Sequence, residues 1–220
     1  MLISTGLIVA ISALVSLPIA ICTAFYLFNF SRRNSYFPTL IRICLDVLAS
    51  TPSIVFGLFG SAFFCLYLNM GFSIISGGLT LACMILPAVI RMVEEGLNAV
   101  PREQRLNGKA LGLSDTAIFF NLLLPAAAPA ITAALLLGIG RALSETAALL
   151  FTSGYVLRTP ESIFDSGRAL SIHIYDLSMN VPGGDQNAYR SAAVLLFVLL
   201  LINSCALLTM KYFFKRITAS

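Results

Sequence analysis

The chain has 220 residues, of which 58% are hydrophobic and 11% are charged, and its formal net charge is +4. A soluble domain carries about 25% charged residues, so this chain lacks the polar surface that a globule needs in water. The composition therefore predicts an integral membrane protein and disfavours a soluble one. The positive charge does not indicate nucleic-acid binding, because the basic residues lie in the loops between apolar runs.

The cysteines and the single histidine do not form a metal-binding pattern. No two cysteines have a Cys-x-x-Cys spacing, and His173 has no neighbour at the spacing of a second ligand. All five cysteines lie in or beside apolar runs, so we interpret them as buried free thiols and expect no zinc or iron–sulfur site. They are Cys22, Cys44, Cys65, Cys83 and Cys205.

Five apolar runs are long enough to cross a membrane, which takes about 20 residues. The first run has no basic residue before it and is followed by Ser31-Arg32-Arg33, which argues against a signal peptide. The second run breaks at Ser50-Thr51-Pro52, which predicts a short helix at the cytoplasmic face and then a span. The expected spans are about 3–28, 52–70, 74–93, 127–152 and 189–208.

The distribution of basic residues predicts the orientation of these spans. Most of them fall in the segments assigned to one side, and membrane proteins keep such residues in the cytoplasm. The amino terminus is therefore expected outside and the carboxyl terminus inside. The residues assigned inside are Arg32, Arg33, Arg42, Arg91, Arg102, Arg105, Lys109, Lys211, Lys215 and Arg216, and those outside are Arg158, Arg168 and Arg190.

Two polar loops lie on either side of the fourth expected span. Residues 94–115 form a cytoplasmic loop with charges of both signs and apolar residues at roughly helical spacing. Pro101 and Gly112 divide this loop into short helices, which are suited to docking on a soluble partner or lying on the membrane surface. Residues 154–188 are polar and are expected to form an external loop.

Charged and small residues within the runs predict specific packing. Arg42 and Asp46 are four residues apart, so we expect them to pair on one helix face. Ser76-Gly77-Gly78 is a small-residue patch suited to close helix packing. Arg141 and Glu145 are also four apart in an apolar run, where an unpaired charge costs about 3 kcal/mol on insertion scales. Such a pair normally faces a bundle interior or a wet cavity.

The loop resembles a motif of importers of the ATP-binding-cassette (ABC) class, E-A-A-x3-G-x9-I-x-L-P. Gly112 is followed ten residues later by Leu122-Leu123-Leu124-Pro125, which matches the second half of the motif. Ala110-Leu111 resembles the usual approach to the glycine. The sequence departs from the first half, because Leu106-Asn107-Gly108 stands where E-A-A is expected.

Four further stretches narrow the resemblance to the PstA-type membrane subunits of phosphate importers, over nearly the whole chain. This resemblance implies an all-α, polytopic helical bundle with the MetI-like permease fold, in a single domain over 1–220. The family has six spans where we count five, so one at the amino terminus is expected to be missing. The stretches are 51–60, 86–95 with Ala99-Val100-Pro101, 140–147 and 149–152.

The resemblance also implies partners and a location in the bacterial cytoplasmic (inner) membrane. The expected partners are a second, homologous permease of the PstC type, a dimeric cytoplasmic ATPase of the PstB type and an extracytoplasmic phosphate-binding protein of the PstS type. The chain has no G-x4-G-K-[ST] phosphate loop. ATP and Mg²⁺ are therefore expected on the partner ATPase, and this chain is expected to bind no cofactor and not to be an enzyme.

The site residues follow from this resemblance and from the chemistry of anion binding. Arginine presents a planar, permanently charged fork that suits phosphate oxygens. The substrate-pathway candidates are Arg141, Glu145, Arg91 and Glu94, and the ATPase-coupling candidates are Leu106, Ala110, Leu111, Gly112 and Pro125. A permanent Arg141–Glu145 pair that only fixes helix packing remains open, and so does an anchoring role for Arg91 and Glu94 at the membrane interface.

The sequence leaves one alternative function open and disfavours two others. A permease for another oxyanion, such as phosphonate, molybdate or sulfate, has the same kind of loop. An intramembrane enzyme is disfavoured, because His173 is alone and Asp46 has no aspartate partner. A passive channel or scaffold is disfavoured by the coupling-type loop.

Overall fold

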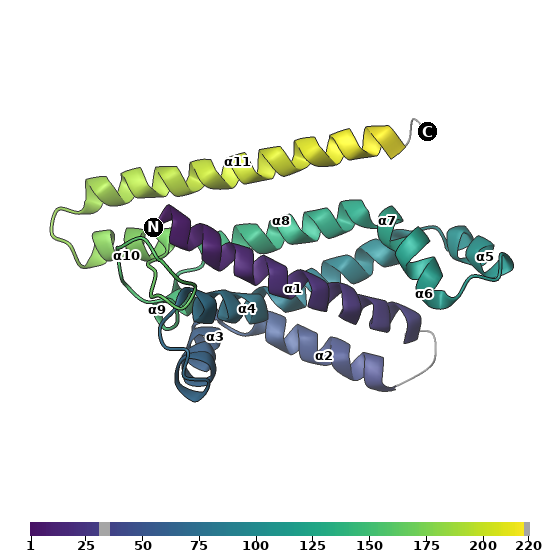
Figure 1. Cartoon of the computed structure of the whole chain (residues 1–220), viewed down its shortest axis with the longest axis horizontal. Coiled ribbons are helices and arrows are strands. Elements are labelled where there is room, and N and C mark those ends of the chain that lie inside the picture. The colour runs from purple at the N-terminus through teal and green to yellow at the C-terminus, as the bar shows by residue number, and fades with distance from the viewer. Residues whose placement is uncertain (31–35, 218–220) are drawn as a thin grey trace.

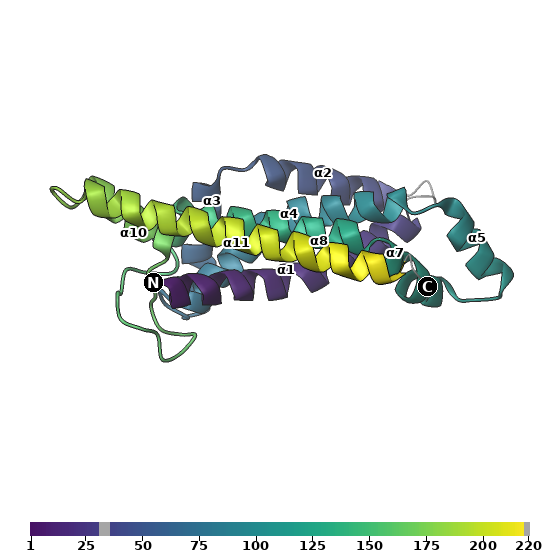
Figure 2. The same cartoon turned by 90° about the horizontal axis from the view of Figure 1, so that it is seen from above.

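The computed structural model describes residues 1–30 and 36–217, so Arg32 and Arg33, used in the topology prediction, lie outside the described residues. The described chain is helical and contains no strand, which confirms the predicted all-α helical bundle. Its long helices run along one common axis (Figures 1 and 2). The helices are α1 (Leu2–Phe30), α2 (Tyr36–Ser50), α3 (Ser53–Gly60), η1 (Ser61–Tyr67), α4 (Ile74–Ala99), α5 (Arg102–Ala110), α6 (Asp115–Ile118), η2 (Phe119–Leu123), α7 (Leu124–Ala126), α8 (Ala128–Ser144), α9 (Ala147–Leu150), α10 (Leu170–Met179) and α11 (Asp185–Ile217).

Helix α4 forms the centre of the bundle, and its core face is buried along its whole length. The helix begins where the Ser73 hydroxyl accepts a hydrogen bond from the Ser76 amide, an N-cap that satisfies one free donor. The predicted small-residue patch packs closely, as expected: a Cβ on Gly78 would lie 2.7 Å from Cγ2 of Ile11 on α1. Removing the side chain at this position lets α1 and α4 approach each other.

The second apolar run forms two helical segments that meet at a sharp bend. Helix α2 runs back along α4, and the pair of α3 and η1 turns away from it by 99°. With 15 residues, α2 is only about 22 Å long at 1.5 Å per residue. The bend between α2, which ends at Ser50, and α3, which begins at Ser53, lies at the predicted Ser-Thr-Pro break, and the membrane span 52–70 stays a prediction.

Helix α3 lies against α4 and α9 through two glycines. A Cβ on Gly57 would lie 2.9 Å from Cα of Ala148, and one on Gly60 would lie 2.7 Å from Cγ2 of Thr80 and 2.9 Å from Cγ2 of Thr152. All three distances are shorter than ordinary van der Waals contacts. The close approach of three backbones at this junction therefore depends on glycine.

Replacing Gly60 with Ala is expected to lower the free energy of unfolding by about 2 kcal/mol, because overpacking a tight site costs about 1–3 kcal/mol. Gly6→Ala is the matched control, since a Cβ on Gly6 would meet nothing within 4 Å. Unfolding of the purified protein in mixed detergent micelles measures both variants. Equal stability of the two variants would contradict the tight junction.

The fourth expected span, 127–152, is interrupted in the structure. A bend of 68° separates the segment of α6, η2 and α7 from α8. Helix α8 then ends at Ser144, because the backbone of Glu145 is extended (φ −76°, ψ 129°), and α9 follows as a single turn. Neither glycine nor proline marks this second break in the sequence.

Among the described residues, three helices are long and apolar enough to cross a membrane: Leu2–Asn29, Ile74–Ala99 and Asp185–Leu208. The number rises to five if each bent pair is counted as one span. The apolar stretch of α11 is not buried within the chain, so its surface is available to lipid or to another subunit.

The expectation of five buried thiols is wrong for three of them. Cys65 is buried and Cys83 is half-buried, but Cys22, Cys44 and Cys205 are exposed on the chain. In a membrane protein the faces that point to lipid are as apolar as the core, so an apolar sequence context does not predict burial within the chain.

Candidate translocation and coupling sites

Arg141 and Glu145 do not form the expected intrahelical pair. Arg141 lies in the last turn of α8 and its side chain is exposed on the chain, whereas Glu145 follows the end of the helix and is half-buried. No ion pair joins them within the described part of the chain. Instead, the Glu145 carboxylate accepts a hydrogen bond from the Ala148 amide at 3.4 Å and its carbonyl accepts one from the Ser171 hydroxyl at 2.7 Å.

The last turn of α8 therefore carries Arg141, whose guanidinium forms no ion pair with the Glu145 carboxylate. It lies toward the end of the bundle that holds the amino terminus and α10 (Figure 1). A cation on an otherwise apolar helix surface is costly in lipid, and such residues normally face a wet cavity or a protein partner. The exposed surface around Arg141 is therefore the candidate substrate-pathway surface.

A second group of charges joins α2 to the carboxyl-terminal half of α4. The Arg42 guanidinium donates two hydrogen bonds to one Glu94 carboxylate oxygen, from Nε at 3.1 Å and from Nη2 at 2.5 Å. Across the same two helices, Arg91 donates one hydrogen bond from Nη2 to an Asp46 carboxylate oxygen. The two pairs differ in burial: the Glu94 side chain is 7% exposed and that of Asp46 is 61% exposed.

These contacts correct the expectation that Arg42 and Asp46 pair with each other along α2. Arg91 and Glu94 do not pair with each other along α4 either. Spacing of three or four residues makes a local pair possible. Here the packing of α2 against α4 offers each charge an opposite partner across the interface, which leaves all four side chains with a partner.

The coupling candidates lie in a segment that projects from the other end of the bundle (Figures 1 and 2). We call residues 101–114 the coupling segment. It contains α5 and a turn in which Gly112 adopts the left-handed region (φ +76°). The segment ends at Ser114, whose hydroxyl accepts a hydrogen bond from the Ala117 amide at 3.2 Å and caps α6. The predicted break at Gly112 is confirmed.

Packing leaves one apolar face of the coupling segment free. A Cβ on Gly108 would lie 2.9 Å from Cγ1 of Ile118, so the inner face of α5 rests against α6. On the other side, the Leu106 and Leu111 side chains are 53% and 78% exposed. Ala110 and Gly112 are exposed as well, whereas Pro125 lies in α7. Such a short helix with exposed leucines suits a groove on a soluble partner.

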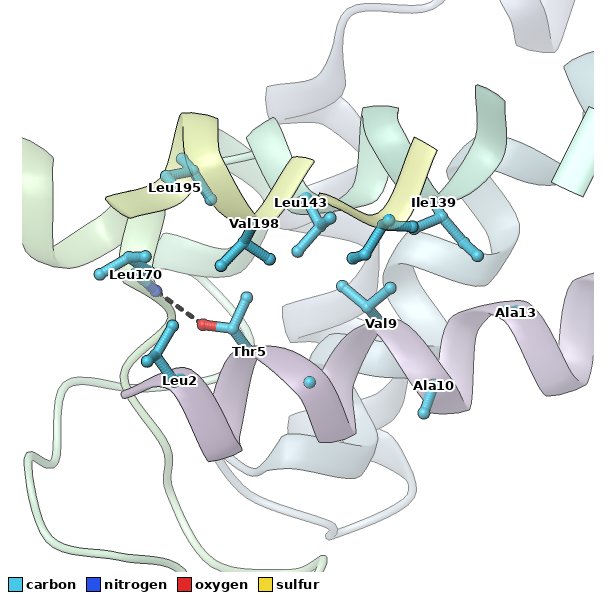
Figure 3. Close-up of a pocket in the computed structure, with 12 residues that line it drawn as sticks. Leu2, Thr5, Val9, Ala10, Ala13, Ile139, Leu143, Leu170, Leu195 and Val198 are labelled. Carbon is cyan, nitrogen blue, oxygen red and sulfur yellow. Dashed lines mark hydrogen bonds between the residues drawn. The ribbon is translucent and has the colours of Figure 1, made fainter. Parts of the chain in front are cut away.

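A cavity of about 250 Å³ lies between α1, α8 and α11 (Figure 3). Its lining is apolar except for Thr5, and the Thr5 hydroxyl is already used: it donates to the Met1 carbonyl and accepts from the Leu170 amide. A phosphate ion that leaves water needs fixed donors or cations. The cavity offers none, so it is not a substrate site.

Arg168 organises a third cluster of charges beside α10. Its Nη2 lies 2.9 Å from Oδ2 of Asp176, and its Nη1 lies 3.4 Å from Nδ1 of His173. A hydrogen bond from the Asn180 amide, together with Arg168, holds the pKa of Asp176 below its usual value, against partial desolvation. Burial and the nearby Arg168 charge lower the pKa of His173.

The lowered pKa of His173 predicts that acid weakens this cluster. The unfolded chain binds a proton at His173 below about pH 6.5, whereas the folded chain resists it, so stability falls as the pH drops through this range. Hydrogen exchange of the α10 amides is expected to speed up between pH 7 and pH 5.5, after correction for intrinsic rates. The His173→Asn variant is expected to lose most of this dependence, and an unchanged dependence would contradict the assignment.

The comparison with known families identifies the class of this protein. Residues 6–219 match the family described as the binding-protein-dependent transport system inner membrane component. Because the match covers nearly the whole chain, the chain belongs to this family of transporter permease subunits. It is a multi-pass membrane protein, and the resemblance to permeases of this kind is confirmed.

Individual relatives narrow the similarity. The chain is 30% identical to the probable ABC transporter permease protein YqgI of Bacillus subtilis, over 97% of this chain and 77% of the relative. It is 36% identical to the phosphate transport system permease protein PstA of Mycobacterium leprae, over 75% of this chain and 54% of the relative. A PstA homolog of Mycoplasma pneumoniae is 30% identical over 91% of this chain, which spans only 32% of that relative.

Proposed function

We propose that this chain is a membrane-spanning permease subunit of an ATP-driven importer of inorganic phosphate. Membership of the permease family and the similarity to proteins named as phosphate permeases support this proposal. The structural observation that carries it is that the chain has both an exposed arginine on an apolar surface and, at the other end of the bundle, a projecting coupling segment. A permease for phosphonate, molybdate or sulfate is the second candidate, and no particular contact favours it.

The proposed pathway runs along a surface shared with a second, homologous permease. Arg141 is exposed on this chain, so a partner subunit is needed to enclose it and to exclude lipid. Interrupted helices line substrate sites in many transporters, and the break at Glu145 places an unwound segment beside Arg141. In this proposal Arg141 binds the moving anion, while Glu145 holds the break in place.

At the inner end, Arg91 and Glu94 are the proposed exit-side residues. Arg91 is half-buried and its partner Asp46 is largely exposed, so a passing anion can replace Asp46 without leaving a buried charge unpaired. Glu94 is buried against Arg42 and would keep α2 in place during passage. The proposed orientation has the coupling segment and carboxyl terminus in the cytoplasm and the amino terminus outside, in the bacterial inner membrane.

The other proposed subunits follow from the class of transporter. A dimeric ATPase would receive the coupling segment and hydrolyse ATP with Mg²⁺, because this chain carries no phosphate loop. An extracytoplasmic phosphate-binding protein would deliver the substrate at the opposite end.

Replacing Gly112 with Val is expected to uncouple ATP hydrolysis from uptake. A side chain at φ +76° is strained by about 1–2 kcal/mol, and nothing packs within 4 Å of the glycine, so the effect lies in the backbone turn. Gly183→Val is the matched control. Gly183 lies between α10 and α11, its φ is +73°, and an added Cβ would likewise meet nothing within 4 Å. Uptake per ATP hydrolysed is measured in reconstituted vesicles, and equal coupling in both variants would contradict the docking role.

Uptake of radiolabelled phosphate tests the proposed function directly. Cells that lack this chain but contain the partner subunits are compared with cells to which the chain is restored, with sulfate, molybdate and a phosphonate as competitors. Restored uptake with competition only by phosphate-like anions supports the proposal. Assembly with an ATPase without phosphate uptake would overturn the substrate, and the absence of any bound ATPase would overturn the permease role.

A further inference from the structure

Arg105 is a nearly buried arginine within the otherwise exposed coupling segment. Its side chain is only 11% exposed, although its neighbour Arg102 on the same helix is exposed. Leu106, the next residue, is about half exposed to solvent. A basic residue on a short surface helix normally keeps its charge in water, so the burial of Arg105 needs a structural reason.

Three contacts account for this burial, and they come from both sides of the segment. Arg105 Nη2 donates to Asn29 Oδ1 at 3.2 Å, and the guanidinium carbon lies 5.2 Å from the centroid of the Phe28 ring. Both partners belong to the last turns of α1. The same Nη2 lies 3.8 Å from the Asp115 carboxylate at the start of α6. One planar guanidinium therefore contacts α1 and α6 from α5, a geometry that the ammonium of lysine does not reproduce.

The contact with α1 joins segments that are far apart in the sequence. Arg105 and Asn29 are separated by 76 positions. Helix α1 in turn packs along α4, where Gly78 meets Ile11, so a displacement of α1 is felt in the centre of the bundle. The covalent connection of the segment to α4 passes instead through Val100 and Pro101, whose backbone is extended and forms no helix.

We propose that Arg105 is a positioning residue that fastens the coupling segment to the inner end of α1, so that movement of the segment by a partner ATPase is transmitted to α1 as well as to α4. This inference rests on the proposed coupling function. Asn29 and Phe28 are the receiving groups on α1, and Asp115 keeps the guanidinium oriented toward them. Without Arg105, the segment would remain connected to α4 through Val100 and Pro101 but would move independently of α1.

The first arm of the test measures transport in the reconstituted complex with its ATPase. Phosphate uptake per ATP is expected to fall at least fivefold in Arg105→Ala and by a similar factor in Asn29→Ala. The double variant is expected to be no worse than Arg105→Ala, because both changes remove the same link. Arg105→Lys should restore little, and the control Arg190→Ala, which removes an exposed arginine outside the coupling segment, should stay within twofold of wild type. Independent, multiplying losses in the double variant would overturn the proposal.

The second arm does not depend on the substrate. Hydrogen exchange of the α5 amides is measured in the purified full chain, where Arg105→Ala is expected to speed exchange about tenfold and Arg102→Ala to leave it unchanged. Unchanged exchange in Arg105→Ala overturns the fastening. Faster exchange with wild-type uptake per ATP overturns the transmitting role. Faster exchange in a chain whose wild type takes up no phosphate refutes the proposed substrate but supports the fastening.

Discussion

Replacing Arg141 with Gln is expected to abolish phosphate uptake, by at least a hundredfold, while the complex still assembles. The guanidinium is exposed on the chain and makes no ion pair with Glu145, so its removal leaves no buried carboxylate uncompensated. Glutamine keeps a polar side chain but loses the fixed charge and the fork that bind an anion. Uptake of radiolabelled phosphate, together with copurification of the ATPase, measures both parts of the expectation.

Two further variants make this result specific. Arg190→Gln makes the same chemical change on the exposed surface of α11 and is expected to leave uptake unchanged. Arg141→Lys keeps the charge and is expected to recover a minor fraction of the rate. Normal uptake by Arg141→Gln would refute the pathway role, and loss of assembly would support the alternative role in helix packing.

Replacing Glu94 with Ala is expected to lower the free energy of unfolding by about 3 kcal/mol or more. The carboxylate is almost fully buried and accepts two hydrogen bonds from Arg42, and removing one partner of a buried ion pair costs about 3–5 kcal/mol. The neighbouring pair supplies the comparison: Asp46→Ala removes a carboxylate that is 61% exposed and is expected to cost less than about 1 kcal/mol. Unfolding in mixed micelles measures both.

A charge exchange separates pairing from burial. The double variant Arg42→Glu with Glu94→Arg restores opposite charges across α2 and α4, so it is expected to recover part of the stability that Glu94→Ala loses. A double variant less stable than either single change, or equal losses in Glu94→Ala and Asp46→Ala, would show that the buried pair does not hold the two helices together.

Local patterns in the sequence predicted much of the fold. Continuous apolar runs predicted the long helices α1, α4 and α11, because only hydrogen-bonded helices satisfy the backbone in lipid. Gly112 was correctly interpreted as a break between short helices, since a glycine turn acts within a few residues. The Ser76-Gly77-Gly78 patch likewise predicted close packing.

Other features of the candidate sites had no adequate local signal. The break at Glu145 lacks glycine and proline, and it is stabilised by hydrogen bonds from Ala148 and from Ser171 of α10. The bend between α2 and α3 was visible as Ser-Thr-Pro, but its 99° angle follows from the glycine contacts of α3 with distant helices. The sequence did not predict a structural role for Arg105, because its hydrogen-bond partner Asn29 lies 76 positions away on α1.

The sequence by itself determined that this protein is a helical membrane protein of the permease class, because composition, apolar runs and short motifs depend on neighbouring residues. Only the tertiary structure decided which charges pair and which side chains are buried. Arg42 reaches Glu94 rather than Asp46, and Arg141 is free of Glu145, because helix packing brings competing partners across an interface. Spacing along one helix makes a pair possible, but the free energy of the whole bundle selects the pair that forms.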